Sequence, residues 1–114
     1  MASPGKSNIE LLRQALAGRS GAEEFYAVLD ERIEWDTTRA PGGTTVHGRD
    51  AVRAYMPTWR HGWEYWSFDE EGFLEHGDRI LTPALGDRIA AWTFRGGKVV
   101  RFEWYEDASE ALEP

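Results

Sequence analysis

Asp36 is the carboxylate whose position in the sequence best suits a general acid or base. It follows Ile33 and Trp35 in a run, 32–37, where charged and apolar residues alternate. Such alternation is typical of a half-buried strand, and it directs Ile33 and Trp35 to the core and Asp36 to the opposite face. A twist or bulge at the strand end would instead turn Asp36 toward aromatic residues, where desolvation raises the pKa of a carboxyl group. The sequence leaves both orientations open, and Asp36 is the predicted catalytic residue.

Large aromatic side chains are the second group that suggests a function. By strand alternation Trp92 shares a face with Phe94, and Phe102 shares one with Trp104. Rings in this number either fill the core or line a cavity for a flat or apolar ligand, because Trp and Tyr favour sites where their polar tips find a partner. The predicted ligand-binding residues are Tyr26, Trp35, Tyr55, Trp59, Trp63, Trp92 and Trp104.

The remaining polar residues match no motif for a metal, a phosphate group or a serine nucleophile. His47, His61 and His76 lack the spacing of metal ligands. The acidic run 69–71 lacks the spacing of a calcium loop, and no serine lies in a nucleophile-elbow context. We therefore expect no metal and no cofactor.

Composition narrows the class of protein. The chain has 114 residues with 20 acidic against 13 basic side chains, and its net charge of −7 argues against a nucleic-acid partner. No apolar run is long enough to span a membrane, and residues 1–7 have no signal-peptide core, so a cytoplasmic location is expected. With 41% hydrophobic residues the chain can form one domain, 1–114, whose ordered core is expected at about 8–108.

Helices are expected first and strands last. Ser7 with Glu10, and Ser20 with Glu23, form capping boxes that predict two N-terminal helices. A third helix is expected over 49–63, with a kink or an early end at Pro57. Alternation predicts strands over 32–37, 44–48, 65–74, 79–85, 88–94 and 98–105, most of them joined by Gly-containing hairpin turns. This order indicates an α+β domain with a mainly antiparallel sheet.

Three stretches resemble the SnoaL-like branch of the nuclear transport factor 2-like superfamily. They are Leu29–Trp35, Val46–Arg53 and Trp92–Glu103, and the resemblance extends over about 8–111. It implies a cone-shaped fold in which three N-terminal helices pack on a curved sheet around a pocket, in a homodimer. Relatives carry a longer hairpin near 79–95, so a shortened hairpin is expected here.

The resemblance does not fix a reaction. Superfamily members include ketosteroid isomerases, polyketide cyclases and epoxide hydrolases. The isomerase base falls on Thr37 and the oxyanion-hole positions on Leu12 and Ala90, whereas the last acid of the epoxide hydrolases falls on Trp104. No pair of a His and an acid, as in the cyclases, can be placed in the pocket.

Three hypotheses follow. The protein is an acid–base enzyme of isomerase, cyclase or hydrolase type, acting on an apolar substrate through Asp36. Alternatively, it binds a small apolar or aromatic molecule without catalysing a reaction. In the third hypothesis it is a homodimerising interaction module whose pocket is filled by its own tryptophans.

Overall fold

The computed structural model describes residues 7–17, 23–68 and 70–111. Two helices, α1 (Asn8–Ala17) and α2 (Glu23–Ala27), precede the first strand. The strands are β1 (Leu29–Asp36), β2 (Thr45–His47), β3 (Leu74–His76), β4 (Arg79–Pro83), β5 (Ile89–Arg95) and β6 (Lys98–Tyr105). Between β2 and β3 lie α3 (Arg49–Tyr55), the 3₁₀ turn η1 (Met56–Thr58), α4 (Arg60–Glu64) and the 3₁₀ turn η2 (Glu70–Gly72), and α5 (Ala108–Ala111) follows β6.

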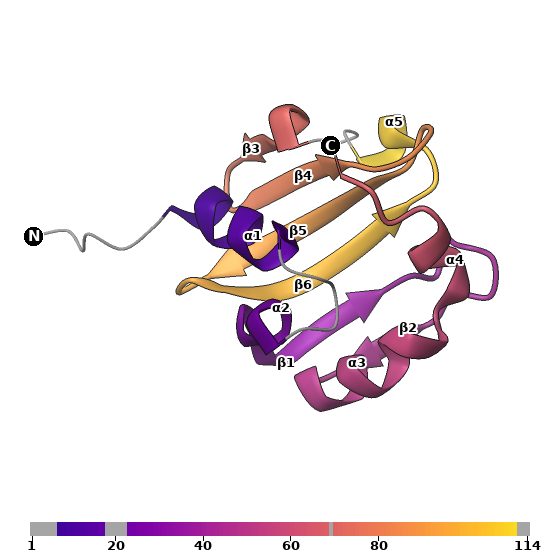
Figure 1. Ribbon diagram of the computed structural model, residues 1–114, viewed down its shortest axis with the longest axis horizontal. Coiled ribbons are helices and arrows are strands. Elements are labelled where there is room, and N and C mark those ends of the chain that lie inside the picture. The colour runs from indigo at the N-terminus through magenta and orange to yellow at the C-terminus, as the bar shows by residue number, and fades with distance from the viewer. Residues whose placement is uncertain (1–6, 18–22, 69, 112–114) are drawn as a thin grey trace, which may run out of the picture.

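The strands form one six-stranded mixed sheet in the order β2-β1-β6-β5-β4-β3. β1 and β6 pair in parallel, and the other neighbouring strands pair antiparallel. The predicted α+β class with N-terminal helices is therefore confirmed. Figure 1 shows that α1 and the chain between α4 and η2 cross the same face of the sheet, here called the inner face. Among the described residues no helix is long and apolar enough to cross a membrane.

α1 begins as its capping residues predict. The backbone N–H of Glu10 donates to Ser7 Oγ over 3.3 Å, and this bond satisfies one of the free amides of the first turn. Leu12 and Ala15 then lie on the buried side of the helix. The second predicted capping box includes Ser20, which lies outside the described residues.

The helix predicted over 49–63 is interrupted at Pro57, as expected. Proline has no amide hydrogen, and the chain changes there from α3 to η1 and then leaves helical geometry at Trp59 (ψ 80°). This break turns the Trp59 side chain inward, where it is buried. A Cβ at Gly62 would lie 2.2 Å from the Trp59 ring, so only glycine allows the indole to pack on the backbone of α4.

The strand predicted over 65–74 is wrong. Residues 65–68 form no regular element, η2 follows, and only Leu74–His76 pairs with β4. The physical reason is that this stretch has to lead the chain from α4, near β1, to the opposite edge of the sheet (Figure 1). It crosses the inner face instead of joining the ladder, and its rings pack against the sheet.

Alternation sorts the strands into two faces, as the sequence predicts for β5 and β6. Trp92, Phe94, Phe102 and Trp104 are buried in the main core with the helices. On the opposite, outer face a smaller apolar group forms under α5, where Ala111 is buried. The ordered core was expected to end at about residue 108, whereas α5 extends it to Ala111. The members of this smaller group are Leu81, Ile89, Ala91, Tyr105 and Ala111.

Candidate functional site

The inner face of the sheet carries a set of packed rings, here called the aromatic cluster. Its members are Phe25, Trp35, Trp59, Trp66, Phe68, Trp92, Phe102 and Trp104. The parallel register of β1 and β6 sets Trp35 opposite Phe102, and their rings stack with centroids 3.8 Å apart. Trp92, opposite Phe102 on β5, meets that ring edge-on at 4.7 Å. The strand pairing therefore builds the floor of the cluster directly.

Trp66 is the central member of the aromatic cluster. Its ring lies beside every other ring of the cluster, at centroid distances between 4.8 and 6.4 Å. It is nearly parallel to Trp104 (5°) and to Trp35 (22°), whereas Trp92 and Phe25 meet it edge-on. Trp66 was not among the predicted ligand-binding residues, because residues 65–74 were predicted to form a strand.

The aromatic cluster is closed. Trp35, Trp92, Phe102 and Trp104 have 0% exposed surface, and Trp59 has 4%. A large hollow of the described surface lies elsewhere, at the exposed side of η1 and α4, and includes no ring of the cluster. Another, more apolar hollow lies between α1, α2 and the β5–β6 turn. In this structure the rings themselves fill the space in which the sequence predicts a ligand.

Four buried indole N–H groups of the aromatic cluster differ in whether they have a hydrogen-bond acceptor. Trp92 Nε1 donates to Thr82 Oγ1 (2.9 Å), and Trp104 Nε1 donates to a carboxylate oxygen of Glu106 (2.6 Å). By contrast, the buried Nε1 atoms of Trp35 and Trp59 have no hydrogen-bond acceptor among the described residues. A buried donor without an acceptor costs about 1–3 kcal/mol, and such groups are rare in native cores.

Thr37 and Tyr55 form a hydroxyl pair where the resemblance placed an isomerase base. The two oxygens lie 2.8 Å apart, and Thr37 Oγ1 also exchanges hydrogen bonds with the backbone of Thr44. Because the Thr37 hydroxyl donates to the Thr44 carbonyl, the Tyr55 hydroxyl donates to Thr37. Tyr55 stacks on Trp59 at 6.2 Å and is half-buried, so it lies at the edge of the aromatic cluster.

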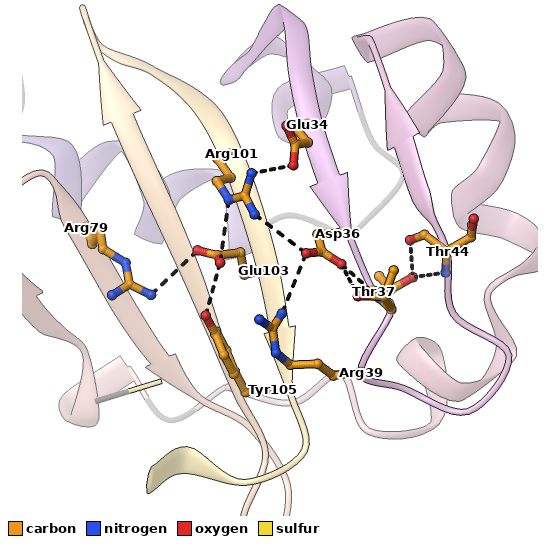
Figure 2. Close-up of polar contacts among 10 residues, drawn as sticks. Glu34, Asp36, Thr37, Arg39, Thr44, Arg79, Arg101, Glu103 and Tyr105 are labelled. Atoms are coloured by element: carbon orange, nitrogen blue, oxygen red, sulfur yellow. Dashed lines mark hydrogen bonds and ion pairs between the residues drawn. The ribbon is translucent and has the colours of Figure 1, made fainter. Parts of the chain in front are cut away.

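Asp36 lies on the outer face, where Figure 2 shows it between Arg101 and Arg39, whereas the preceding residue Trp35 belongs to the aromatic cluster. It accepts hydrogen bonds from the backbone N–H and the hydroxyl of Thr38 (2.9 and 2.6 Å), and it pairs with Arg39 and Arg101 (3.6 Å each). Burial raises the pKa of Asp36, but the Thr38 hydrogen bonds and the two arginines outweigh it and hold the pKa below its usual range. Its catalytic role stays a prediction, and the geometry gives it no contact with the rings.

The neighbours of Asp36 complete a charged network on the outer face (Figure 2). Arg101 contacts Glu34 as well as Asp36, and it lies 3.5 Å from a carboxylate oxygen of Glu103. Glu103 also pairs with Arg79 (3.5 Å) and accepts the Tyr105 hydroxyl hydrogen bond (3.0 Å). Charges of both signs alternate here, so each carboxylate of the network has an arginine partner.

A histidine–carboxylate pair lies at the end of β6, beside the aromatic cluster. His61 Nε2 is 2.9 Å from Glu106 Oε2, the same oxygen that accepts the Trp104 N–H, and Arg88 lies 3.2 Å from the other oxygen. Burial raises the pKa of Glu106, but the hydrogen bonds from Trp104 and His61 and the charge of Arg88 lower it overall. An ionised carboxylate only accepts, so Nε2 of His61 donates and a neutral His61 keeps its lone pair on Nδ1.

Sequence reasoning did not find this pair. The two residues are 45 positions apart, and no motif links them. The fold brings them together because the break at Pro57 directs α4 toward the end of β6. Within the described residues, no group of three His, Asp or Glu side chains is placed to hold a metal ion.

The other predicted ligand-binding residues lie in different settings. Tyr26 is buried at the margin of the core, with the Arg53 guanidinium 4.5 Å above its ring and Phe25 edge-on at 5.2 Å. Burial raises the pKa of Tyr26, so its hydroxyl stays protonated. The side chain of Trp63 lies outside the described residues. Trp35, Trp59, Trp92 and Trp104 come together in the aromatic cluster, with Tyr55 at its edge.

Comparison with known proteins shows likeness in structure. No family model and no curated protein matches the sequence. Among solved structures, TerC co-crystallised with polyporic acid is 22% identical, with a TM-score of 0.70 over 92% of this chain and 95% of TerC. An NTF2-like protein of unknown function from Burkholderia pseudomallei is 25% identical, with a TM-score of 0.61 over 94% of this chain and 96% of its own.

A third likeness is to a ketosteroid isomerase-like protein from Catenulispora acidiphila in complex with trimethylamine. It is 12% identical, with a TM-score of 0.60 over 97% of this chain and 92% of its own. All three structures superpose on most of this chain with TM-scores of 0.60 or more. The chain therefore has the nuclear transport factor 2-like fold, also called the ketosteroid isomerase-like fold.

Proposed function

We propose that this protein is a SnoaL-like protein that binds a small, flat aromatic molecule against the aromatic cluster. The observation that carries the proposal is the pair of buried indole N–H groups of Trp35 and Trp59, which have no acceptor among the described residues. A purely structural core would not retain two unsatisfied donors among rings, because each destabilises the fold. A ligand with an acceptor oxygen at its edge would satisfy them.

Two of the structural neighbours support the proposal. TerC was crystallised with polyporic acid, and the Catenulispora acidiphila protein was crystallised with trimethylamine. Chains of this fold therefore include proteins that bind small molecules. Of the predicted ligand-binding residues, Trp35 and Trp59 would orient the ligand, and Trp92, Trp104 and Tyr55 would bound it. Tyr26 and Trp63 stay predictions that the proposal does not need.

The test compares two probes of nearly equal shape by isothermal titration calorimetry. 2-Acetonaphthone carries a carbonyl acceptor, and 2-ethylnaphthalene carries none. One recovered hydrogen bond contributes about 1 kcal/mol, so the wild type is expected to prefer the ketone about fivefold. Trp35→Phe or Trp59→Phe removes one donor and is expected to reduce that preference.

Trp92→Phe is the matched control. Its N–H already has an acceptor in Thr82, so this variant is expected to weaken both probes alike and to keep their ratio. A ratio that falls equally in all three variants would show that the unsatisfied donors do not orient the ligand. Binding of neither probe would leave the aromatic cluster as a core only, which favours the hypothesis of a homodimerising interaction module.

An acid–base reaction on an apolar carbonyl compound is the second candidate function. The His61–Glu106 pair favours it, because Glu106 fixes the His61 ring and leaves Nδ1 to take a proton. Proton NMR in D₂O would follow exchange of the methyl hydrogens of 2-acetonaphthone. Exchange lost in His61→Gln and kept in Asp36→Asn would assign the base to His61, and the reverse would assign it to Asp36. Exchange no faster than without protein would leave binding alone.

The predicted homodimer is also a proposal. The mixed charged and aromatic residues Arg101, Glu103 and Tyr105 on the outer face suit a polar interface with a second copy. Sedimentation equilibrium of the wild type tests it directly, since a single species of 13.0 kDa would exclude the dimer at the concentrations used.

A further inference from the structure

Trp66, like Phe68, differs from the strand-borne rings of the aromatic cluster in the element that carries it. Trp35, Trp92, Phe102 and Trp104 project from paired strands, and Phe25 projects from α2. Trp66 projects from the irregular segment 65–68, whose neighbouring residue Ser67 is exposed. Trp66 itself is only partly buried, and its ring packs against the closed core of the sheet.

The Trp66 indole lies in a flat slot. Trp104 and Trp35 lie nearly parallel to it, at centroid distances of 6.3 and 6.4 Å, and Trp92 and Phe25 close the slot with their edges. Trp59 also meets it edge-on at 6.1 Å. The two indoles with unsatisfied N–H groups, Trp35 and Trp59, therefore both border the ring of Trp66.

We infer that the Trp66 indole occupies the ligand's own place, and that the ligand is a fused two-ring aromatic with an oxygen acceptor that enters as Trp66 leaves. The inference rests on the proposed function and narrows its ligand class. The slot fits a ring system the size and flatness of an indole, because an indole fills it. The acceptor is required because the indole of Trp66 presents carbon and an N–H donor to its neighbours and gives Trp35 and Trp59 no oxygen.

The segment 65–68 can move without unpairing the sheet. Its described backbone bonds are local: Tyr65 N–H donates to the carbonyls of His61 and Gly62 in α4, and Ser67 N–H donates to Tyr65 (2.9 Å). The Arg88 guanidinium lies 3.5 Å above the Tyr65 ring and anchors the start of the segment. Rotation after Tyr65 would withdraw Trp66 while the strands and α4 stay in place.

Displacement predicts a specific effect on affinity. If only a small fraction of molecules has Trp66 withdrawn, the apparent affinity is reduced by that fraction. Removal of the indole eliminates this reduction. Trp66→Ala is therefore expected to bind 2-acetonaphthone at least tenfold more tightly than the wild type. Ser67→Ala, a change of an exposed residue in the same segment, is expected to bind as the wild type does.

A measurement on the wild type itself covers the case in which Trp66→Ala fails to fold. Protein labelled with 5-fluorotryptophan gives separate ¹⁹F signals, and the signal missing from Trp66→Phe belongs to Trp66. On titration with 2-acetonaphthone, the solvent isotope shift of this signal between H₂O and D₂O is expected to rise to that of free fluorotryptophan. The signals of Trp92 and Trp104 are expected to keep their small isotope shifts.

The outcomes separate the inference from the proposed function. A wild type that binds the probe while the Trp66 signal stays protected, or a Trp66→Ala variant that folds and binds it no better, overturns the inference and leaves the binding function standing. A folded Trp66→Ala variant that binds neither 2-acetonaphthone nor indole overturns both. Tighter binding by Trp66→Ala together with an exposed Trp66 in the liganded wild type supports both.

Discussion

The inner and outer faces of β6 carry opposite kinds of side chain only one residue apart. Phe102 and Trp104 are fully buried among rings, whereas Arg101 and Glu103 between and beside them form ion pairs on the other side. On the inner face the area of buried ring stabilises the fold, and hydrogen bonds are incomplete. On the outer face the polar groups satisfy one another, and little apolar area is buried outside the group under α5. The polar network thus has its partners, whereas two buried indole N–H groups among the rings have no acceptor within the described residues.

This contrast indicates where function belongs. A network such as that of Asp36, Arg101 and Glu103 neutralises its own charges and stabilises structure, so it is poorly suited to bind a further charged group. The aromatic cluster has unsatisfied donors beside a ring carried by an irregular segment. The proposed ligand site therefore lies on the inner face, and the outer face has its polar groups already paired.

The largest expected effect comes from Phe102→Ala. Loss of a fully buried ring that stacks on Trp35 is expected to lower the free energy of unfolding by about 3–5 kcal/mol, measured by urea denaturation. Glu103→Ala, at the next residue on the outer face, is the control and is expected to lower it by about 1 kcal/mol. Equal losses would show that the two faces contribute alike and would break the comparison.

Glu106→Gln removes the carboxylate that accepts the Trp104 N–H on the inner face and also contacts His61 and Arg88. The change removes a charged acceptor shared by Trp104 and His61, and the expected loss of unfolding free energy is about 1–2 kcal/mol at pH 7. His61→Gln keeps the Trp104 bond and is expected to lose less. A greater loss in His61→Gln would show that the contact of Glu106 with His61 in α4 stabilises the fold more than its contact with Trp104 in β6.

Asp36→Asn is expected to lower the unfolding free energy by about 1 kcal/mol at pH 7, because the Thr38 hydrogen bonds can persist while the arginine pairs lose their charge. The pKa of Asp36 is lower in the folded state than in the unfolded chain, so its contribution is complete above the unfolded value, near pH 4, and is lost as the pH falls through the folded value. The difference between variant and wild type should therefore shrink below about pH 4 in urea titrations at several pH values. A constant difference down to pH 2 would contradict this assignment.

Glu34→Gln is expected to have the smallest effect. Glu34 contacts Arg101, but both side chains are more than a third exposed, and such pairs contribute less than about 0.5 kcal/mol. Urea denaturation in low and high salt would check it. If Glu34→Gln lowered the unfolding free energy more than Asp36→Asn, the exposed Glu34–Arg101 pair would stabilise the fold more than the more buried pairs of Asp36.

The sequence predicts the elements of this fold where one physical rule acts alone. Strand β6 has the predicted bounds because its alternation is regular and glycines precede it. The interruption at Pro57 follows from a missing amide hydrogen. The rule fails over 65–74, where large rings separated by small or polar residues also suit a segment that covers a sheet, and only tertiary packing decides between the two.

The candidate site is predicted in composition but not in arrangement. Alternation places Trp35, Trp92 and Trp104 on one face, yet the closure of the rings depends on Trp66, whose position no local pattern specifies. The His61–Glu106 pair depends on the direction of α4 after a proline break, which is a long-range property. Whether Trp35 and Trp59 find acceptors depends on three-dimensional geometry that the sequence does not encode locally.

The spacing of the indoles also has an optical consequence. The rings of Trp35, Trp59, Trp66, Trp92 and Trp104 lie with neighbouring centroids 5.2 to 6.5 Å apart. At such separations their transition dipoles couple, and excitation energy passes among the rings faster than any one of them emits. The near-ultraviolet circular dichroism of the coupled rings therefore reports their mutual orientation. A change at a single ring alters the circular dichroism of its neighbours, so this spectrum shows whether the aromatic cluster is closed.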